Sequence, residues 1–382
     1  MEIKNRKDEL YMKWNLQRRR ALYKGVAVTI GALLLCGSFL SVPYIASAIP
    51  SEFGAYLADE PHAPPLAALH AEEKKPNAGT SSPNDEQSDT SADDNSGAET
   101  SDTSTPPSPP EGALTVFADS FCWYTDPAEA ALNIINRTNY AVDLKEFLTR
   151  KYPVSLSPAA QKNEPIVLIL HTHGSESYLP AGVDYYLPEE DFRSEDPEET
   201  VVSVGDMIAK TLEALGIPVL HDRTMHDLKD FNNAYTESRS AAREALAKHP
   251  SIRYILDIHR DSIFTQNNIC EKTLTEINGK QVAQLMLVVG TDQDGAAHPD
   301  WRQNLTVATQ LEELLNNLYP TLARPINLRS SAFNQALSPG ALLVEVGSCG
   351  NTIEEAREAG RLFAVSFATL LRENHSFATK KP

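Results

Sequence analysis

Several features that mark common protein classes are scarce or missing in this chain of 382 residues. It has four cysteines and no Cys-x-x-Cys pair, which argues against a disulfide-rich scaffold and a cysteine-based zinc ribbon. Its 34 lysines and arginines are outnumbered by 52 acidic residues, which argues against a nucleic-acid-binding protein, whose surface carries a basic patch or stripe. Hydrophobic residues make up 41% of the chain, which is low for a polytopic membrane protein but sufficient for one sizeable core.

One long uncharged stretch is present near the N-terminus. Residues 1–24 form a basic segment, and residues 25–51 contain no charged side chain. About 20 apolar residues suffice to span a bilayer, and a basic flank stays in the cytoplasm. We therefore predict a single-pass anchor in the cytoplasmic membrane over residues 25–49, with the rest of the chain extracytoplasmic. The alternative is a cleaved signal peptide, with Ala46-Ser47-Ala48 as the cleavage site.

The anchor is followed by a segment of low complexity. Residues 50–112 are rich in Ser, Thr, Pro and acidic residues, and such a composition cannot bury enough apolar surface to offset chain entropy. We predict a disordered acidic linker here. A globular composition begins at residue 113, and the folded extracytoplasmic domain is predicted over residues 113–375.

Apolar runs alternate with amphipathic stretches from residue 165 onward. Three continuous runs are typical of strands buried on both faces, namely Ile166–Leu170, Ile252–Ile258 and Ala341–Val346. Helical periodicity predicts helices over Val201–Leu215, Tyr235–Lys248, Gln303–Leu318 and Ile353–Leu371. Asn278-Gly279 predicts a hairpin between strands at Lys272–Ile277 and Gln281–Val289. The fold class is therefore predicted to be α/β, with a mostly parallel sheet and helices on both faces.

Polar residues follow the three buried runs, where the strands are expected to end. His171, His173 and Glu176 follow the first run, and His259 follows the second. Glu345 lies near the end of the third run. Because sites in open α/β sheets lie beyond the carboxyl ends of strands, we expect these side chains to converge.

The spacing His173-x-x-Glu176, joined by His259 from another strand, predicts a zinc site. Two histidines and one glutamate are a ligand set of catalytic zinc that leaves a position for water, as in zinc carboxypeptidases. Glu345 is then the candidate general base. His173 is preferred because Gly174 gives its backbone room, and His171 is the alternative ligand or a supporting residue. Glu176 either binds the metal, orients a histidine or serves as the base.

Other polar residues have less specific signals. Asp257 and Asp261 flank His259, and we expect them to support ligands through hydrogen bonds rather than to bind metal. His298, Asn334 and Gln335 are candidates for substrate binding, with helix-terminal packing or loop hydrogen bonding as the alternative.

Two other hydrolase classes are not favoured. A serine hydrolase lacks support because the motif Gly-x-Ser-x-Gly is absent. A cysteine amidase using Cys349 has no sequence signature, and the sequence leaves open whether Cys270 and Cys349 pair.

These motifs together resemble those of the stage II sporulation protein P (SpoIIP) family. The similarity spans residues 114–371, and its most specific segments are LHTHGSESY, DIHRDS, VVGTDQDGAAHPDW and RPINLRSSAFNQALSPGALLVEVGSCGNTIEEA. The resemblance implies a zinc-dependent N-acetylmuramoyl-L-alanine amidase with a fold similar to the Amidase_3 type. That type has its ligand Glu at the start of the first long helix, which makes Glu199 the alternative to Glu176.

The resemblance also implies a biological setting. The substrate would be peptidoglycan, cleaved during septal wall remodelling and engulfment in sporulation, with an endopeptidase activity also credited to the family. Implied partners are stage II sporulation proteins D and M. A zinc endopeptidase acting on wall cross-links only, or a non-catalytic module that binds the wall and recruits other proteins, remain as alternatives.

Overall fold

The computed structural model describes residues 108–121, 133–156 and 164–375. The predicted anchor at residues 25–49 and most of the predicted linker lie outside these ranges. Among the described residues, no helix is both long enough and apolar enough to cross a membrane.

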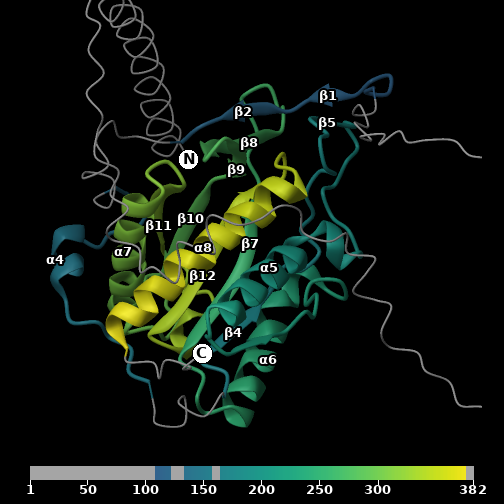
Figure 1. Cartoon of the computed structure of the whole chain (residues 1–382). Coiled ribbons are helices and arrows are strands. Elements are labelled where there is room, and N and C mark those ends of the chain that lie inside the picture. The colour runs from purple at the N-terminus through teal and green to yellow at the C-terminus, as the bar shows by residue number, and fades with distance from the viewer. Residues whose placement is uncertain (1–107, 122–132, 157–163, 376–382) are drawn as a thin grey trace, which may run out of the picture. The chain divides into compact units, whose positions relative to one another are not determined.

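A sheet of seven strands forms the centre of the described domain (Figure 1). In spatial order it contains β3 (Ile134–Asn136), β11 (Ala323–Arg329), β10 (Leu285–Gly290), β12 (Gly340–Ser348), β7 (Tyr254–Asp261), β4 (Val167–Leu170) and β6 (Val219–His221). Neighbouring strands are parallel except β10 and β12, which are antiparallel. The prediction of a mostly parallel sheet is therefore confirmed.

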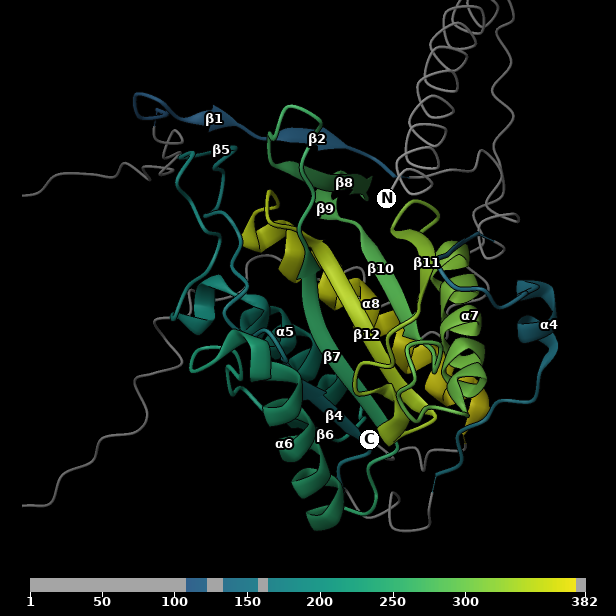
Figure 2. The ribbon, with the colours of Figure 1, turned by 180° about the vertical axis from the view of Figure 1, so that it is seen from behind.

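Helices cover both faces of this sheet. On one face, α8 (Ile353–Asn374) lies between α5 (Val201–Ala214) and α7 (Trp301–Leu318) and contacts both (Figure 1). On the other face, α6 (Ala234–Lys248) packs through Ala242 against β4 and β7 (Figure 2). A short helix, α4 (Leu144–Thr149), contacts α7.

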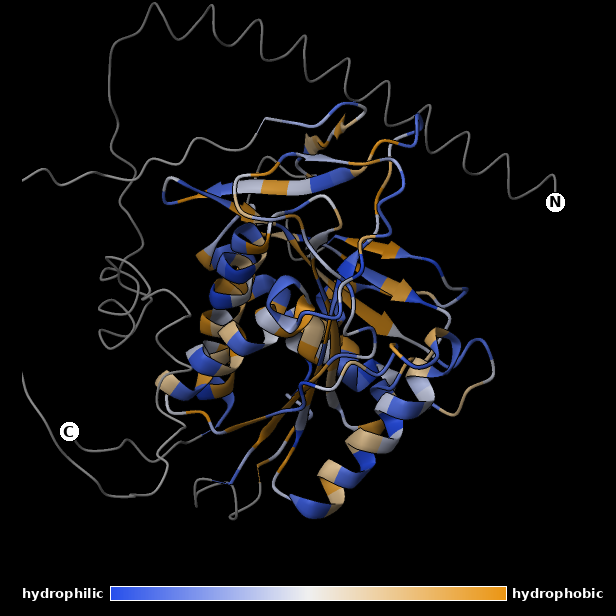
Figure 3. Ribbon diagram, turned by 90° about the vertical axis from the view of Figure 1, so that its right-hand side faces the viewer, coloured by the Kyte–Doolittle hydropathy of each residue, from blue (hydrophilic) through white to orange (hydrophobic). Residues whose placement is uncertain are grey.

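The core lies between the sheet and these helices. The strands are largely apolar along their length, whereas the helices show hydrophilic residues on their outer sides (Figure 3). Strands β4 and β10 are buried at every position, as expected for strands covered on both faces. On the α8 face, Tyr254 of β7 packs edge-on against Phe367, which stacks on Phe363.

Two smaller sheets accompany the central one. One contains β2 (Phe117–Asp119), β8 (Glu271–Ile277) and β9 (Lys280–Ala283), and the other contains β1 (Leu114–Thr115) and β5 (Tyr185–Tyr186). The predicted hairpin is confirmed, because Asn278 and Gly279 connect β8 and β9 with φ angles of 52° and 77°.

One predicted strand, Gln281–Val289, is in fact two. It divides at Gln284 into β9 of the small sheet and β10 of the central sheet. The buried Gln284 side chain donates to Thr321 O and accepts from Phe121 N, so a polar residue marks the place where the chain changes sheets.

Candidate metal centre

The central sheet brings three strand ends to one edge. Strands β12, β7 and β4 are neighbours and run parallel, so their carboxyl ends lie together. His173 and Glu176 follow β4, and His259 lies in β7. Glu345 of β12 is the direct register partner of His259. Directly opposed residues on adjacent strands point to the same face, so the sheet places His259 and Glu345 side by side.

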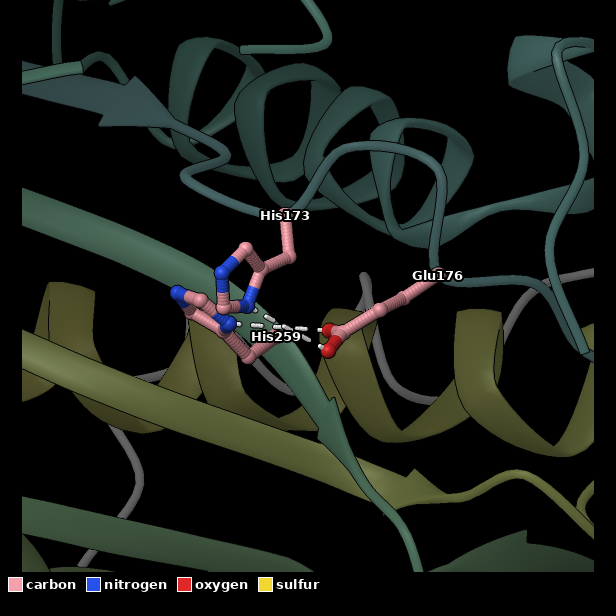
Figure 4. A group of neighbouring side chains, drawn as sticks. All are labelled: His173, Glu176 and His259. Carbon is pink, nitrogen blue, oxygen red and sulfur yellow. Dashed lines mark ion pairs between the residues drawn. The ribbon is translucent and has the colours of Figure 1, made fainter. Parts of the chain in front are cut away.

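His173, Glu176 and His259 converge on one point (Figure 4). His173 Nδ1 lies 3.6 Å from Glu176 Oε1, and His259 Nδ1 lies 3.5 Å from Glu176 Oε2. One ligand atom from each residue falls within 4.8 Å of the others. These separations exceed ordinary N–H···O hydrogen bonds. They match the edge of a tetrahedron whose metal–ligand bonds are about 2.0–2.2 Å, so the donor set fits zinc.

The loop after β4 is shaped by glycine and by two aspartates. A Cβ on Gly174 would lie 2.7 Å from the backbone Cα of Met225, so only glycine fits this turn. Thr172 donates two hydrogen bonds to the Asp257 carboxylate, one from its backbone N–H and one from its hydroxyl. Ser175 donates the same two kinds of hydrogen bond to the Asp227 carboxylate. These bonds hold both ends of the segment that carries His173.

The electrostatics of the site favour positive charge. Burial opposes ionisation of Glu176, but the two histidines beside it lower the pKa of its carboxyl below the ordinary range. Burial also disfavours a charged His259, yet Asp257 and Glu176 raise the pKa of its imidazole well above the usual value. A pair of carboxylates on either side of His259 is therefore suited to a bound cation.

Asp257 occupies the position expected of a residue that orients His259. Its Oδ1 lies 3.0 Å from His259 Nε2, on the side of the ring away from Glu176, although the N–H direction is not that of a good hydrogen bond. Behind it, Thr172 is linked through Ser238 to the amide of Asn334, with 2.8 Å for each bond. A buried polar chain thus extends from Asn334 to the candidate ligand.

Glu345 lies beside the metal-binding group without belonging to it. It is partly exposed, while its Oε2 atom is buried and has no hydrogen-bond partner among the described residues. Burial, followed by the negative charge of Asp261, raises the pKa of the Glu345 carboxyl to about 8. Asp261 itself pairs with Arg324 at 3.0 Å.

The two alternative ligands lie elsewhere. His171 is fully buried, and its Nε2 lies 2.8 Å from His221 Nε2 while its Nδ1 lies 3.2 Å from Ile258 O. Burial lowers the pKa of His171 to about 3. Glu199 is exposed at the end of a 3₁₀ turn and accepts a hydrogen bond from Ser194. The structure therefore brings His173 and Glu176 to the site in preference to His171 and Glu199.

None of the three substrate-binding candidates belongs to this group, although hydrogen bonds link Asn334 through Ser238 and Thr172 to Asp257 beside it. Because β10 and β11 run opposite to β12, the loops that carry His298, Asn334 and Gln335 leave from the other edge of the sheet. All three side chains are buried. The Gln335 amide bonds to Gly290 N and Val288 O, and Asn334 joins the polar chain behind Asp257. The side chains of Asn334 and Gln335 thus take part in internal hydrogen bonds, which is the alternative to substrate binding that the sequence left open for them.

Two aromatic residues near the site were not predicted from the sequence. Phe231 stacks on the His173 ring at a centroid distance of 4.6 Å, and Tyr235 meets the same ring edge-on at 5.5 Å. Phe231 is nevertheless 50% exposed. Phe231 belongs to the connection between β6 and α6, and Tyr235 lies in the first turn of α6. No motif in that segment distinguishes them from core aromatics.

Comparison with known proteins adds a family match and several weaker structural likenesses. The model of the family described as Stage II sporulation protein P (SpoIIP) matches residues 42–368. Stage II sporulation protein P of Bacillus subtilis (strain 168) is 31% identical over 233 residues. That match covers 56% of this chain and 55% of the relative, so the chain spans about half the length of the curated relative it matches.

Solved structures with a similar arrangement are N-acetylmuramoyl-L-alanine amidases of low sequence identity. AmiC2 of Nostoc punctiforme is 16% identical, with 55% of this chain and 96% of that chain covered and a TM-score of 0.31. The CwlD amidase from Clostridioides difficile, solved in complex with the GerS lipoprotein, is 14% identical and has a TM-score of 0.32. The match covers 53% of this chain and 96% of the amidase chain.

Proposed function

This chain belongs to the stage II sporulation protein P family, and on that premise we propose that it is a zinc-dependent peptidoglycan hydrolase of sporulation. The bond cleaved is the amide between N-acetylmuramic acid and L-alanine. The observation that carries the proposal is the convergence of His173, Glu176 and His259 beside Glu345, whose Oε2 atom has no hydrogen-bond partner within the described part of the chain.

Each residue of the site has a separate role in this proposal. His173, Glu176 and His259 hold the zinc, and Asp257 keeps the His259 ring in place. When bound, the zinc supplies Lewis acidity, which polarises a carbonyl and makes water a stronger acid.

Glu345 is the general base and then the general acid. Its Oε2 atom accepts a proton from the attacking water and later donates that proton to the alanine nitrogen as the amide breaks. A carboxyl with a pKa raised towards neutrality suits both steps, because it holds and releases a proton at working pH.

The setting of this activity is also part of the proposal. The segment 25–49 anchors the chain in the cytoplasmic membrane, residues 50–112 act as a linker, and the catalytic domain acts on the wall outside. Stage II sporulation proteins D and M are the proposed partners.

The test uses the full chain purified in detergent. Bound metal is determined by elemental analysis, and wall digestion is assayed with chelator and after zinc is restored. We expect about one zinc per chain and activity that follows the metal. Absence of metal, together with digestion that is insensitive to chelator, would exclude the zinc mechanism.

The products identify the bond. Mass spectrometry of amidase products shows glycan with free lactyl groups and intact stem peptides, whereas new termini within the peptides indicate an endopeptidase. His259→Ala is expected to abolish both products while the circular dichroism spectrum is unchanged. Wall binding without product and without metal would indicate the recruitment module instead.

A further inference from the structure

Two cysteines outside the candidate metal centre lie in contact. The Sγ atoms of Cys270 and Cys349 are 2.9 Å apart, although the residues are 79 positions apart in the sequence. Both side chains are fully buried. A disulfide bond is about 2.0 Å long, and ordinary contacts between unbonded heavy atoms lie near 3.5–4.0 Å. The two sulfur atoms are therefore closer than simple packing requires.

Backbone hydrogen bonds hold both cysteines in this position. Cys270 N donates to the Tyr186 hydroxyl at 2.9 Å, and Cys270 O accepts from Phe117 N at 2.9 Å. Cys349 N donates to Asp261 O at 3.0 Å. Gly350 leaves room beside the pair, since a Cβ there would lie 3.2 Å from Cys270 Sγ. These contacts fix the two backbones that carry the facing sulfur atoms.

The surroundings do not suit a metal. The two cysteines belong to one apolar cluster that also contains Val116, Leu179, Tyr186 and Phe192. Among the described residues, the group of His, Cys, Asp and Glu side chains that could hold a metal is the one at His173, and these cysteines are not part of it.

We propose that Cys270 and Cys349 form a disulfide bond in the mature protein. The oxidant is a second disulfide, either on a thiol oxidoreductase or on a small molecule such as oxidised glutathione. The Cys349 thiolate attacks one sulfur of that disulfide and releases the other as a thiolate. Cys270 then loses its proton and attacks the Cys349 sulfur, which releases the second thiol. Two protein thiols are oxidised and one disulfide is reduced to two thiols.

The acidity of the two thiols agrees with this order. The hydrogen bond with Cys270 lowers the pKa of the Cys349 thiol to about 7, and the same contact raises the pKa of Cys270. Cys349 is therefore the thiol that ionises first. Both thiols are fully buried in the finished fold, so the bond closes as the two segments come into contact during folding.

The bond would fasten the sheet edge that carries the candidate metal centre. Cys349 comes directly after β12, four residues beyond Glu345, and is hydrogen-bonded to the end of β7. Cys270 comes directly before β8. The crosslink therefore joins the end of β12 to the small sheet β2-β8-β9. This proposal does not depend on which bond the protein hydrolyses.

The first test identifies the linkage in the full chain. Fully reduced protein is refolded in a glutathione redox buffer, free thiols are alkylated, and unreduced proteolytic fragments are analysed by mass spectrometry. We expect a fragment pair joined through Cys270 and Cys349, with Cys36 and Cys122 alkylated. Alkylation of both Cys270 and Cys349, or their linkage to other cysteines, would overturn the proposal. Cys122→Ser serves as the control and should leave the linked pair unchanged.

A second test measures what the bond contributes. Reductant should lower the Tm of the wild-type chain by about 10 °C, as expected for loss of a native crosslink. The double variant C270A/C349A should show no response to reductant. Equal Tm values for wild-type protein with and without reductant would contradict the proposal, and this comparison does not depend on whether the double variant folds.

Discussion

His259 shows how single side chains define the candidate metal centre. Its ring lies between Glu176 on one side and Asp257 on the other, and both carboxylates favour positive charge at this point. Asp257 is in turn held by two hydrogen bonds from Thr172, at 2.9 and 2.6 Å. The position of this candidate ligand is thus supported by residues outside the group His173, Glu176 and His259.

Asp257→Asn should weaken zinc binding while the fold is retained. Asparagine has the same shape but loses the charge that orients His259, and such changes typically cost 10–100-fold in metal affinity. The affinity is measured by competition with a chromophoric chelator. Asp261→Asn is the matched control, because Asp261 lies on the same strand but pairs with Arg324. Equal losses in the two variants would contradict a specific role for Asp257.

Phe231→Ala should also weaken zinc binding, though less. Its ring is stacked on His173 at 4.6 Å, and an aromatic pair contributes about 0.5–1.5 kcal/mol, which corresponds to a loss of roughly 2- to 12-fold. Leu228→Ala is the control, since Leu228 lies in the same connection and is 51% exposed, with none of the ring contacts that Phe231 makes. An unchanged zinc affinity in Phe231→Ala would show that stacking does not position His173.

At the scale of elements, strand direction decides which loops reach the site. The three parallel strands β12, β7 and β4 present their carboxyl ends together, whereas β10 and β11 present theirs at the opposite edge. Helix α8 follows β12 directly and contacts α5, α7 and β12. Its N-terminus is fixed by a capping box in which Thr352 accepts from Glu355 N and the Glu355 side chain accepts from Thr352 N.

Thr352→Ala should lower the free energy of unfolding by about 1–2 kcal/mol. The change removes the side-chain acceptor at the N-cap of α8, and Glu355 N–H, a buried donor, loses its partner. The effect is measured by urea denaturation of the full chain. Thr352→Ser keeps the hydroxyl and should retain most of the stability. A serine variant as unstable as the alanine variant would assign the loss to the methyl group rather than to the cap.

The stability of the whole domain should depend on one buried acid of α7. Glu312 is 1% exposed, and burial raises the pKa of its carboxyl well above the usual range, with Arg324 opposing the shift. A raised folded-state pKa means that the folded chain binds the proton more tightly than the unfolded chain. This contribution to stability is therefore complete below the ordinary pKa near 4.5 and is lost as the pH rises above it.

Glu312→Gln should accordingly stabilise the protein at pH 8 more than at pH 5. Glutamine is neutral at both values, so the variant removes the cost of ionising a buried acid. Urea denaturation at the two pH values measures the difference. The exposed neighbour provides the control, and Glu313→Gln should change stability by less than about 0.5 kcal/mol. A destabilisation by Glu312→Gln that is equal at both pH values would contradict the assignment.

Much of the architecture follows from local sequence. Continuous apolar runs identified β4, β7 and β12, and Asn278-Gly279 identified the β8–β9 hairpin, because burial and turn geometry impose residue preferences that can be seen within a few positions. The prediction that polar residues at the ends of parallel strands converge was borne out for His173, Glu176 and His259, because parallel strands share an edge.

The rest was decided by tertiary structure. The antiparallel insertion of β10 separates His298 and Gln335 from the metal-binding group, and strand direction leaves no local signal in the sequence. The choice of His173 over His171 depends on the turn that follows β4 and on His221, which lies 50 residues beyond His171 and occupies its ring. The contact between Cys270 and Cys349 joins segments that meet only when β12 and β8 pack. The sequence by itself indicated the four long helices, three central strands and the polar residues that follow them, while long-range packing decided which of those polar groups share one site.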